Sequence, residues 1–288
     1  NSWGWLDHAS AEIKKSIEIF PGDIRDPHGV NDAMRGCDAV LHLAALIAIP
    51  YSYHSPDTYI NTNVKGTLNV LQAARQLGVK RVIHTSTSEV YGTAQFVPIT
   101  EEHPLQGQSP YSASKIGADQ LAYSFYSSFD LPVVTVRPFN TYGPRMRLND
   151  GRVLPAFIGQ ALRGEDLTMF GDGSQTRAFC YVDDLVEGIY RLLLSDYAQP
   201  VNIGNPDEIT IKEFGEEIIK LTGTTQKLIS LPLPTDDPKQ RKPDITKAKA
   251  LLGWEPKVSR ADGLKITYEY FKSLSPEDLH RMAHHKEF

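Results

Sequence analysis

The chain has 288 residues, of which 41% are hydrophobic and 23% are charged, so it is long enough for one large core or two domains. A formal net charge of -5 without a sustained basic run argues against a nucleic-acid binder, and no apolar stretch reaches the ~20 residues of a membrane span. The start at Asn1 does not resemble a secretory signal, and Cys37 and Cys180 lack metal-type spacing. We therefore expect a cytoplasmic protein with no metal site, no nucleic-acid partner and no membrane contact.

Short apolar runs alternate with helical patterns in the first two-thirds of the chain. Strands of the buried parallel type are predicted over residues 17–23, 38–45, 79–87 and 132–140. A helix is predicted over 56–77, opened by Ser55-Pro56 and closed by Gly78, and another from Pro110 to about residue 125. This alternation predicts right-handed βαβ crossovers and a doubly wound, parallel, Rossmann-like α/β sheet.

The composition changes near residue 145, where prolines and shorter elements become frequent. We expect residues 1–145 to form the sheet domain, and residues 146–288 to form mainly a smaller α/β substrate lobe with some segments returning to the sheet. Its elements are predicted near 152–163, 168–172, 179–182, 183–194, 211–221 and 260–273. The polar tail over 275–288 is expected to be loosely held.

A dinucleotide-binding sheet of this kind begins with a strand, a G-x-x-G-x-x-G turn and a helix whose N-terminus receives the pyrophosphate. No such motif occurs in the sequence. We therefore expect the first βαβ unit to be missing, either because the sequence lacks an N-terminal segment that contains it or because this sheet has lost it.

Three polar motifs follow the predicted strands. "HTSTSEVYGT" at 84–93 places hydroxyls after a strand, which is also typical of a capped turn. "PYSASKIGAD" places Tyr111 and Lys115 four residues apart on one helix face, where the ammonium should lower the phenol pKa from ~10 and make Tyr111 a general base. "RPFNTYGPR" at 137–145 follows at a sensible distance. The order of the three motifs favours a catalytic site.

These motifs resemble the extended short-chain dehydrogenases/reductases of the NAD-dependent epimerase/dehydratase family, which act on nucleotide sugars. The resemblance implies a triad of Thr87, Tyr111 and Lys115, in which Tyr111 removes the proton of the sugar 4-hydroxyl while a hydride passes from C4 to NAD. It also implies a UDP-sugar substrate and a homodimer formed through the helices near 56–77 and 110–126.

The resemblance further assigns binding residues. For NAD they are Asp23, Ile24, Leu43, Ala44, Ala45, Asn63, Thr85, Tyr111 and Lys115. For the nucleotide sugar they are Thr87, Asn140, Arg145, Arg152, Val153, Arg177 and Arg241, and guanidinium groups suit phosphate oxygens. Each has a simpler interpretation, such as a turn cap for Asp23, a buried amide satisfied locally for Asn63 or a solvated charge for Arg177, but the set together favours binding.

Ser88 and Glu89 bear on the reaction type as further candidate catalytic residues. Glu89 could remove the C5 proton of the keto sugar and allow loss of the C6 hydroxyl as water, which defines a 4,6-dehydratase. Ser88 is a weak proton donor where glucose-type dehydratases carry Asp. The triplet Thr-Ser-Glu is, however, similar to that of GDP-mannose 4,6-dehydratases and of UDP-glucuronate decarboxylases.

The two halves of the chain resemble different relatives. Residues 1–145 are similar to N-acetylglucosamine-nucleotide 4,6-dehydratases of the legionaminic-acid type, and residues 140–288 to UDP-glucuronate decarboxylases. Because the first half holds the proton-transfer residues, we predict a 4,6-dehydratase for a UDP-sugar of the N-acetylglucosamine type. The alternatives are a UDP-glucuronate decarboxylase, a nucleotide-sugar 4-epimerase and a non-catalytic nucleotide-sugar-binding module.

Overall fold

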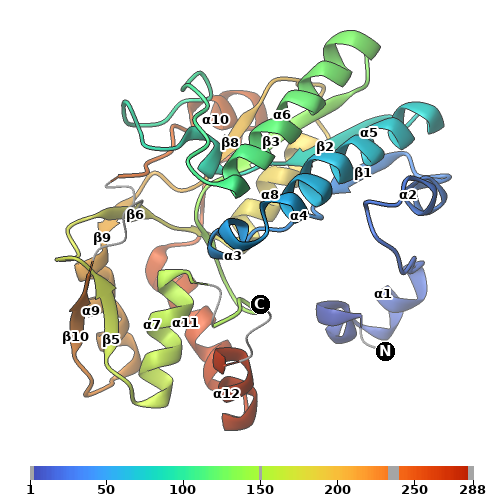
Figure 1. Cartoon of the computed structure of the whole chain (residues 1–288). Helices are drawn as coiled ribbons and strands as arrows, with labels where there is room; N and C mark the ends of the chain where they lie inside the picture. The colour runs from blue at the N-terminus through green and yellow to red at the C-terminus, as the bar shows by residue number, and fades with distance from the viewer. Residues whose placement is uncertain (1–2, 149–150, 233–239, 285–288) are drawn as a thin grey trace.

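A four-stranded parallel sheet forms the centre of the computed structural model, which describes residues 3–148, 151–232 and 240–284 (Figure 1). The strand order is β1-β2-β3-β8, and all three pairs are parallel. The strands are β1 (Ala39–His42), β2 (Arg81–Thr85), β3 (Val133–Pro138) and β8 (Val201–Ile203). Because β8 comes from the second half of the chain, residues after 146 complete this sheet.

Helices cover both faces of the sheet. On one face lie α2 (Pro27–Met34), α5 (Gly66–Leu77) and α6 (Pro110–Phe129). Leu71, Ala74 and Ala122 of these helices share a buried cluster with Val82 and Val133 of the sheet. The opposite face packs against α8 (Val182–Leu193) and α10 (Thr246–Leu252) through Ile83, Val134, Ile203 and Trp254. Burial on both faces explains the continuous apolar runs, and the doubly wound α/β prediction is confirmed.

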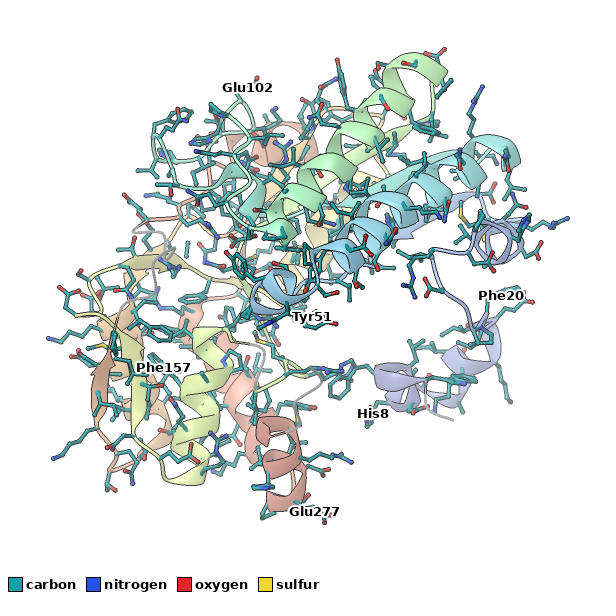
Figure 2. All side chains as sticks on the ribbon, in the orientation of Figure 1. His8, Phe20, Tyr51, Glu102, Phe157 and Glu277 are labelled. Atoms are coloured by element: carbon teal, nitrogen blue, oxygen red, sulfur yellow. The ribbon has the colours of Figure 1, made fainter. Side chains whose placement is uncertain are left out.

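The strand predicted over residues 17–23 is wrong. These residues belong to no strand, and the preceding η1 (Gly4–His8) and α1 (Ala11–Ser16) bury no residue. Figure 2 shows His8 and Phe20 on an arm that extends away from the sheet. Among the described residues no strand lies beside this segment to pair with its backbone, and β1 is the edge of the sheet, with Leu41 48% exposed.

The helical segment predicted over 56–77 is confirmed but is not uniform. It comprises α4 (Pro56–Tyr59), a π-helical stretch η2 (Ile60–Lys65) and α5, which ends at Gly78 in the left-handed conformation with φ 67°. A short helix α3 (Ile49–His54), which we did not predict, precedes it. Single-turn π segments are frequent at functional sites, and this one carries Asn63.

The remaining elements form a second lobe below the sheet in Figure 1. Its core is aromatic, with Phe157, Phe179, Phe214 and Phe271 buried together, and Figure 2 shows Phe157 within it. The elements are β4 (Thr141–Tyr142), α7 (Val153–Arg163), β5 (Leu167–Phe170), β6 (Thr176–Ala178), β7 (Cys180–Tyr181), β9 (Glu208–Thr210), α9 (Ile211–Thr222), β10 (Leu228–Leu231), α11 (Arg260–Lys272) and α12 (Pro276–His284). The division of the chain at residue 145 stays a prediction.

Helix α12 corrects the expectation of a loosely held tail over its described part. The Ser275 hydroxyl accepts a hydrogen bond from the Asp278 amide at 3.0 Å and caps the helix. Leu279 and Met282 pack against the core of the second lobe. No helix in the described ranges combines the length and the apolarity needed to cross a membrane.

We expect Ile203→Ala in β8 to lower the free energy of unfolding by about 2–5 kcal/mol, because Ile203 is fully buried between the sheet and Trp254. Ile266→Ala is the matched control, since Ile266 is 47% exposed on α11 and should cost less than about 0.5 kcal/mol. Urea unfolding measures both. A similar loss in the two variants would contradict the packing of β8 described above.

Candidate active site

The carboxyl end of β2 leads directly into the polar turn noted in the sequence. The strand ends at Thr85, and a short 3-10 helix, η3 (Ser88–Tyr91), follows. The Thr87 hydroxyl accepts a hydrogen bond from the Glu89 amide at 3.2 Å, so Thr87 caps this turn. The capped-turn interpretation is therefore correct locally, and the turn lies at the sheet edge where open α/β folds bind ligands.

Helix α6 brings Tyr111 and Lys115 to the same end of the sheet. Ser109 caps the helix in a reciprocal capping box with Ser112, and Pro110 occupies its first turn. Both functional side chains are buried, Tyr111 at 6% and Lys115 at 4% exposure. The Tyr59 ring meets the Tyr111 ring edge-on, with centroids 6.2 Å apart. These contacts fix the phenol beside the turn that carries Thr87.

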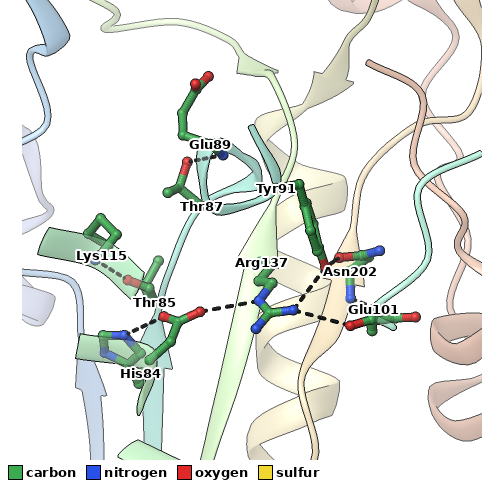
Figure 3. Close-up of polar contacts among 10 residues, drawn as sticks. His84, Thr85, Thr87, Glu89, Tyr91, Glu101, Lys115, Arg137 and Asn202 are labelled. Atoms are coloured by element: carbon green, nitrogen blue, oxygen red, sulfur yellow. Dashed lines mark hydrogen bonds and ion pairs between the residues drawn. The ribbon is translucent and has the colours of Figure 1, made fainter. Parts of the chain in front are cut away.

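The expected lowering of the Tyr111 pKa by Lys115 is wrong for this conformation. Burial raises the pKa of Tyr111 to about 12, opposed by a hydrogen bond with Thr87. The Lys115 ammonium instead donates to the Thr85 carbonyl at 2.6 Å (Figure 3). Burial also lowers the pKa of Lys115 to about 8, so the charged form of Lys115 is less stable than that of an exposed lysine.

Glu89 forms an ion pair with Arg241, which lies 152 positions further along the chain. The segment that carries Arg241 is held by two backbone hydrogen bonds to Ile99. The Ile99 amide donates to the Lys242 carbonyl at 2.7 Å, and the Ile99 carbonyl accepts from the Asp244 amide at 2.8 Å. The Arg241 side chain is 5% exposed, and its Nε has no hydrogen-bond partner among the described residues. A buried guanidinium with spare donors suits an anionic ligand.

The residues predicted to bind NAD lie along β1 and its neighbours. Leu43 and Ala44 are exposed after β1, and Ala45 is half-buried. Asn63 exchanges two hydrogen bonds with the Leu46 backbone at 2.8 and 2.9 Å and donates to Ser114 Oγ at 2.9 Å, so it ties the loop after β1 to α6.

Two further residues predicted to bind NAD, Asp23 and Ile24, precede β1. Asp23 is exposed and pairs with Arg25, whose hydrogen bonds lower the Asp23 pKa to about 2. This is the turn-cap contact weighed for the sequence. Ile24 packs against Gly66, where an added Cβ would collide with the Ile24 side chain. The cofactor roles of these residues stay predictions.

The predicted substrate residues are more dispersed in the chain. The Asn140 carbonyl accepts from the Cys180 amide at 2.8 Å, and Arg145 is exposed with φ 69°. Arg152 donates to the Thr141 carbonyl at 3.4 Å, directly before Val153 opens α7. Arg177 lies half-buried on β6. Of the predicted set, the contacts above gather Thr87, Glu89, Tyr111, Lys115 and Arg241 around the end of β2.

A buried polar network beneath these residues was missed in the sequence (Figure 3). Asp119 accepts from His84 Nε2 at 3.1 Å and from Arg137 Nε at 3.2 Å, and all three side chains are at most 5% exposed. The signal was present, because Tyr111, Lys115 and Asp119 recur at intervals of four residues on one helix face. An aspartate in mid-helix is usually solvated, which hides it.

Comparisons with known proteins agree with this architecture. Residues 1–267 match the family described as GDP-mannose 4,6 dehydratase. The chain belongs to this family of extended short-chain dehydrogenases/reductases. UDP-glucuronic acid decarboxylase 6 of Arabidopsis thaliana is 41% identical over 273 residues, which cover 93% of this chain and 76% of that protein. The relatives are enzymes, so the interpretation as a non-catalytic binding module is not favoured.

Solved structures that are similar to this chain include nucleotide-sugar enzymes with other activities. The dTDP-glucose 4,6-dehydratase DesIV of Streptomyces venezuelae, solved with NAD, has a TM-score of 0.82 and 34% identity, covering 87% of this chain and 78% of that one. UDP-glucuronic acid 4-epimerase of Bacillus cereus was solved with UDP-glucuronic acid and NAD. It has a TM-score of 0.82 and 32% identity, and the match covers 88% of this chain and 81% of that one. The sequence relatives favour the decarboxylase alternative over our first prediction of a dehydratase.

NAD is the cofactor of this family, and the residues at the end of β2 fit it. The Lys115 ammonium uses one N–H group on the Thr85 carbonyl, which leaves two donors for ribose hydroxyls. Thr85 Oγ1 is buried without a hydrogen-bond partner in the described part of the chain. Such a group normally pairs with a ligand or a water.

We expect Lys115→Met to stabilise the protein by about 1–3 kcal/mol near pH 7, because a lysine pKa lowered from 10.5 to about 8 marks an unfavourable buried charge. Between about pH 8 and pH 10.5 the unfolded chain binds more protons than the folded one, so wild-type stability rises and the advantage of Met shrinks. Chemical unfolding at about pH 7 and about pH 10 measures this. A pH-independent difference would contradict it.

Proposed function

We propose that the protein is an NAD-dependent UDP-glucuronate decarboxylase. The observation that carries the proposal is the identity of 40–44% with UDP-glucuronic acid decarboxylases over 89–93% of the chain. The site supports it, since Tyr111, Lys115 and Thr87 suit removal of the proton of the sugar 4-hydroxyl while bound NAD would take the hydride from C4. Arg241 offers a buried cation for an anionic substrate. A UDP-sugar is the expected ligand, as in the similar 4-epimerase.

In the proposed mechanism Tyr111 moves the proton in the first step. Its phenol oxygen, beside the Thr87 hydroxyl, would take the proton of the sugar 4-hydroxyl as C4 becomes a ketone. Bound NAD supplies the acceptor of the C4 hydride and later its donor. Lys115 would stabilise the phenolate by its positive charge, and for this reason its own protonation matters.

The ketone at C4 makes the C6 carboxylate a β-keto acid. The C5–C6 bond breaks, its electron pair passes to the C4 carbonyl as an enolate, and carbon dioxide leaves. A proton then returns to C5 and the C4 ketone is reduced, so the NAD is regenerated and the net change is loss of carbon dioxide. This sequence needs neither a strong acid at C6 nor a free carboxylate base.

The polar turn is better suited to this reaction than to elimination of water. Elimination needs a base at C5 and an acid for the C6 hydroxyl. Glu89 is neutralised by Arg241, and Ser88 is buried and a poor acid. These properties of the two residues favour decarboxylation, which needs neither a base at C5 nor an acid at C6. Glu89 would then orient the sugar or Arg241 rather than remove a proton.

A nucleotide-sugar 4,6-dehydratase of the N-acetylglucosamine type remains the second candidate. It is favoured by the carboxylate of Glu89 two positions after Thr87 and by the similarity to a dTDP-glucose 4,6-dehydratase. For this reaction Arg241 would have to leave Glu89 when the substrate binds. The cytoplasmic location inferred from the composition also stays a prediction.

Incubation with NAD and either UDP-glucuronate or UDP-N-acetylglucosamine, read by mass spectrometry, tests the proposal. We expect loss of carbon dioxide from UDP-glucuronate and no change in the second substrate. Loss of water from UDP-N-acetylglucosamine would establish the dehydratase instead, and an isomer of unchanged mass would indicate a 4-epimerase. Tyr111→Phe should lower turnover at least about 100-fold while it still binds the sugar nucleotide, because it removes only the base. A near-normal rate would exclude Tyr111 from that role.

We also propose a homodimer through α4–α5 and α6. The outer face of α6 exposes Tyr123 at 53% and Phe129 at 44%, and α5 packs beside α6. Aromatic side chains are typical of interface cores. We expect a dimer in equilibrium sedimentation that Tyr123→Glu weakens at least about 10-fold, whereas Tyr190→Glu on α8, equally exposed at 54%, should not. A monomeric wild type would contradict this.

A further inference from the structure

The network beneath the site links three elements of the sheet domain. Asp119 projects from α6, His84 from β2 and Arg137 from β3. One turn earlier on α6, Lys115 reaches the Thr85 carbonyl, the backbone group next to His84. Helix α6 is thus joined to the end of β2 at two neighbouring points, by Asp119 on His84 and by Lys115 on Thr85 (Figure 3).

The same network continues to β8. Arg137 Nη1 donates to the Tyr91 hydroxyl at 3.1 Å and to the Glu101 carbonyl at 3.4 Å. The Tyr91 hydroxyl donates to Asn202 Oδ1 at 2.6 Å. Burial of these polar groups is costly unless each is paired, so a connected arrangement of this kind is rigid.

We propose that Asp119 is a positioning residue for the reaction: held by His84 and Arg137, its carboxylate balances the charge of the Lys115 ammonium and fixes it at the end of β2. The proposal deepens the proposed function, since it concerns the same site. It accounts for an anion buried at 3% exposure one helical turn behind a lysine buried at 4%. Without that anion, the two buried cations Lys115 and Arg137 would lack this compensating charge.

Among the titratable groups around Lys115 and Arg137, Asp119 is the one that supplies the compensating negative charge. Both histidines are neutral at physiological pH: burial lowers the pKa of His42 on β1 to about 3 and also lowers that of His84. Arg137 stays charged, because Tyr91 and Asp119 outweigh its burial and raise its pKa. Asp119 stays ionised, since its burial is outweighed by His84 and Arg137. The remaining groups that face this set are Tyr111 on α6, Tyr91 on η3 and Glu101.

The test is the titration of Lys115, followed by NMR of lysine labelled at Cε, with Lys115→Met to assign the signal. In the wild type we expect a midpoint of about 8. Asp119→Asn should lower the midpoint by about one pH unit, because the opposing carboxylate is lost. The alkaline limb of kcat/KM should move down with it, and Asp119→Glu should restore both. A folded Asp119→Asn protein with an unchanged Lys115 midpoint would overturn the proposal.

Two further variants separate positioning from general stability. Tyr91→Phe breaks the far side of the network, so it should lower the melting temperature without moving the Lys115 midpoint; a shift as large as that of Asp119→Asn would overturn the proposal. If Asp119→Asn does not fold, Arg137→Gln replaces it. Removal of this cation lets the full charge of Asp119 act on Lys115, so the midpoint should rise, and a fall or no change would overturn the proposal.

The titration does not depend on which sugar reaction follows. Failure of the proposed function would appear as no loss of carbon dioxide from UDP-glucuronate by the wild type. Failure of the positioning role would appear as an unshifted Lys115 midpoint, whatever the product is.

Discussion

Burying a lysine ammonium inside a packed sheet domain is unfavourable, and much of this structure can be understood from how that charge is held. Lys115 lies at 4% exposure between α6 and the end of β2. Its partners are the Thr85 carbonyl and, through space, the Asp119 carboxylate. Each partner is in turn fixed, Thr85 by its place in the sheet and Asp119 by His84 and Arg137. The fold thus gives up some stability to keep a buried cation at the end of β2.

That arrangement suits a chemistry in which a proton leaves a hydroxyl oxygen and a hydride leaves the carbon that bears it. The buried phenol of Tyr111 is a poor base by itself, since its pKa is about 12 without a ligand. In the proposed reaction Lys115 therefore serves as a source of positive charge as well as a predicted cofactor-binding group. On the other side of the turn, Arg241 pairs with Glu89, and the backbone bonds between Ile99 and the segment Lys242–Asp244 hold Arg241 there.

The sequence predicted the parts of the fold that follow from local pattern. The strands near 38–45, 79–87 and 132–140 and the helices that begin at Pro56 and Pro110 are visible because burial on both faces and helix caps leave clear signals. The strand over 17–23 failed because pairing depends on a neighbour and not on the segment itself. The π-helical register at Ile60–Lys65 leaves no distinct apolar period.

The candidate site also has residues that the sequence predicted and contacts that it did not. Thr87, Tyr111 and Lys115 were found because their spacing is short and chemically distinctive. The Glu89–Arg241 pair and the His84–Asp119–Arg137 network join residues far apart in the chain, and a single sequence gives no sign of which partners will meet. The preference for a dehydratase rested on the resemblance of residues 1–145, which hold the proton-transfer residues. The contact with Arg241 makes one of these residues, Glu89, less favourable as the base at C5.

The most direct test of the account follows the hydrogen on C4 of the sugar. UDP-glucuronate labelled with deuterium at C4 should give a decarboxylated product that retains the label at C4, because the hydride leaves and returns to the same carbon. NMR of the product locates the label. Loss of the deuterium to solvent, or the absence of a decarboxylated product, would contradict the account.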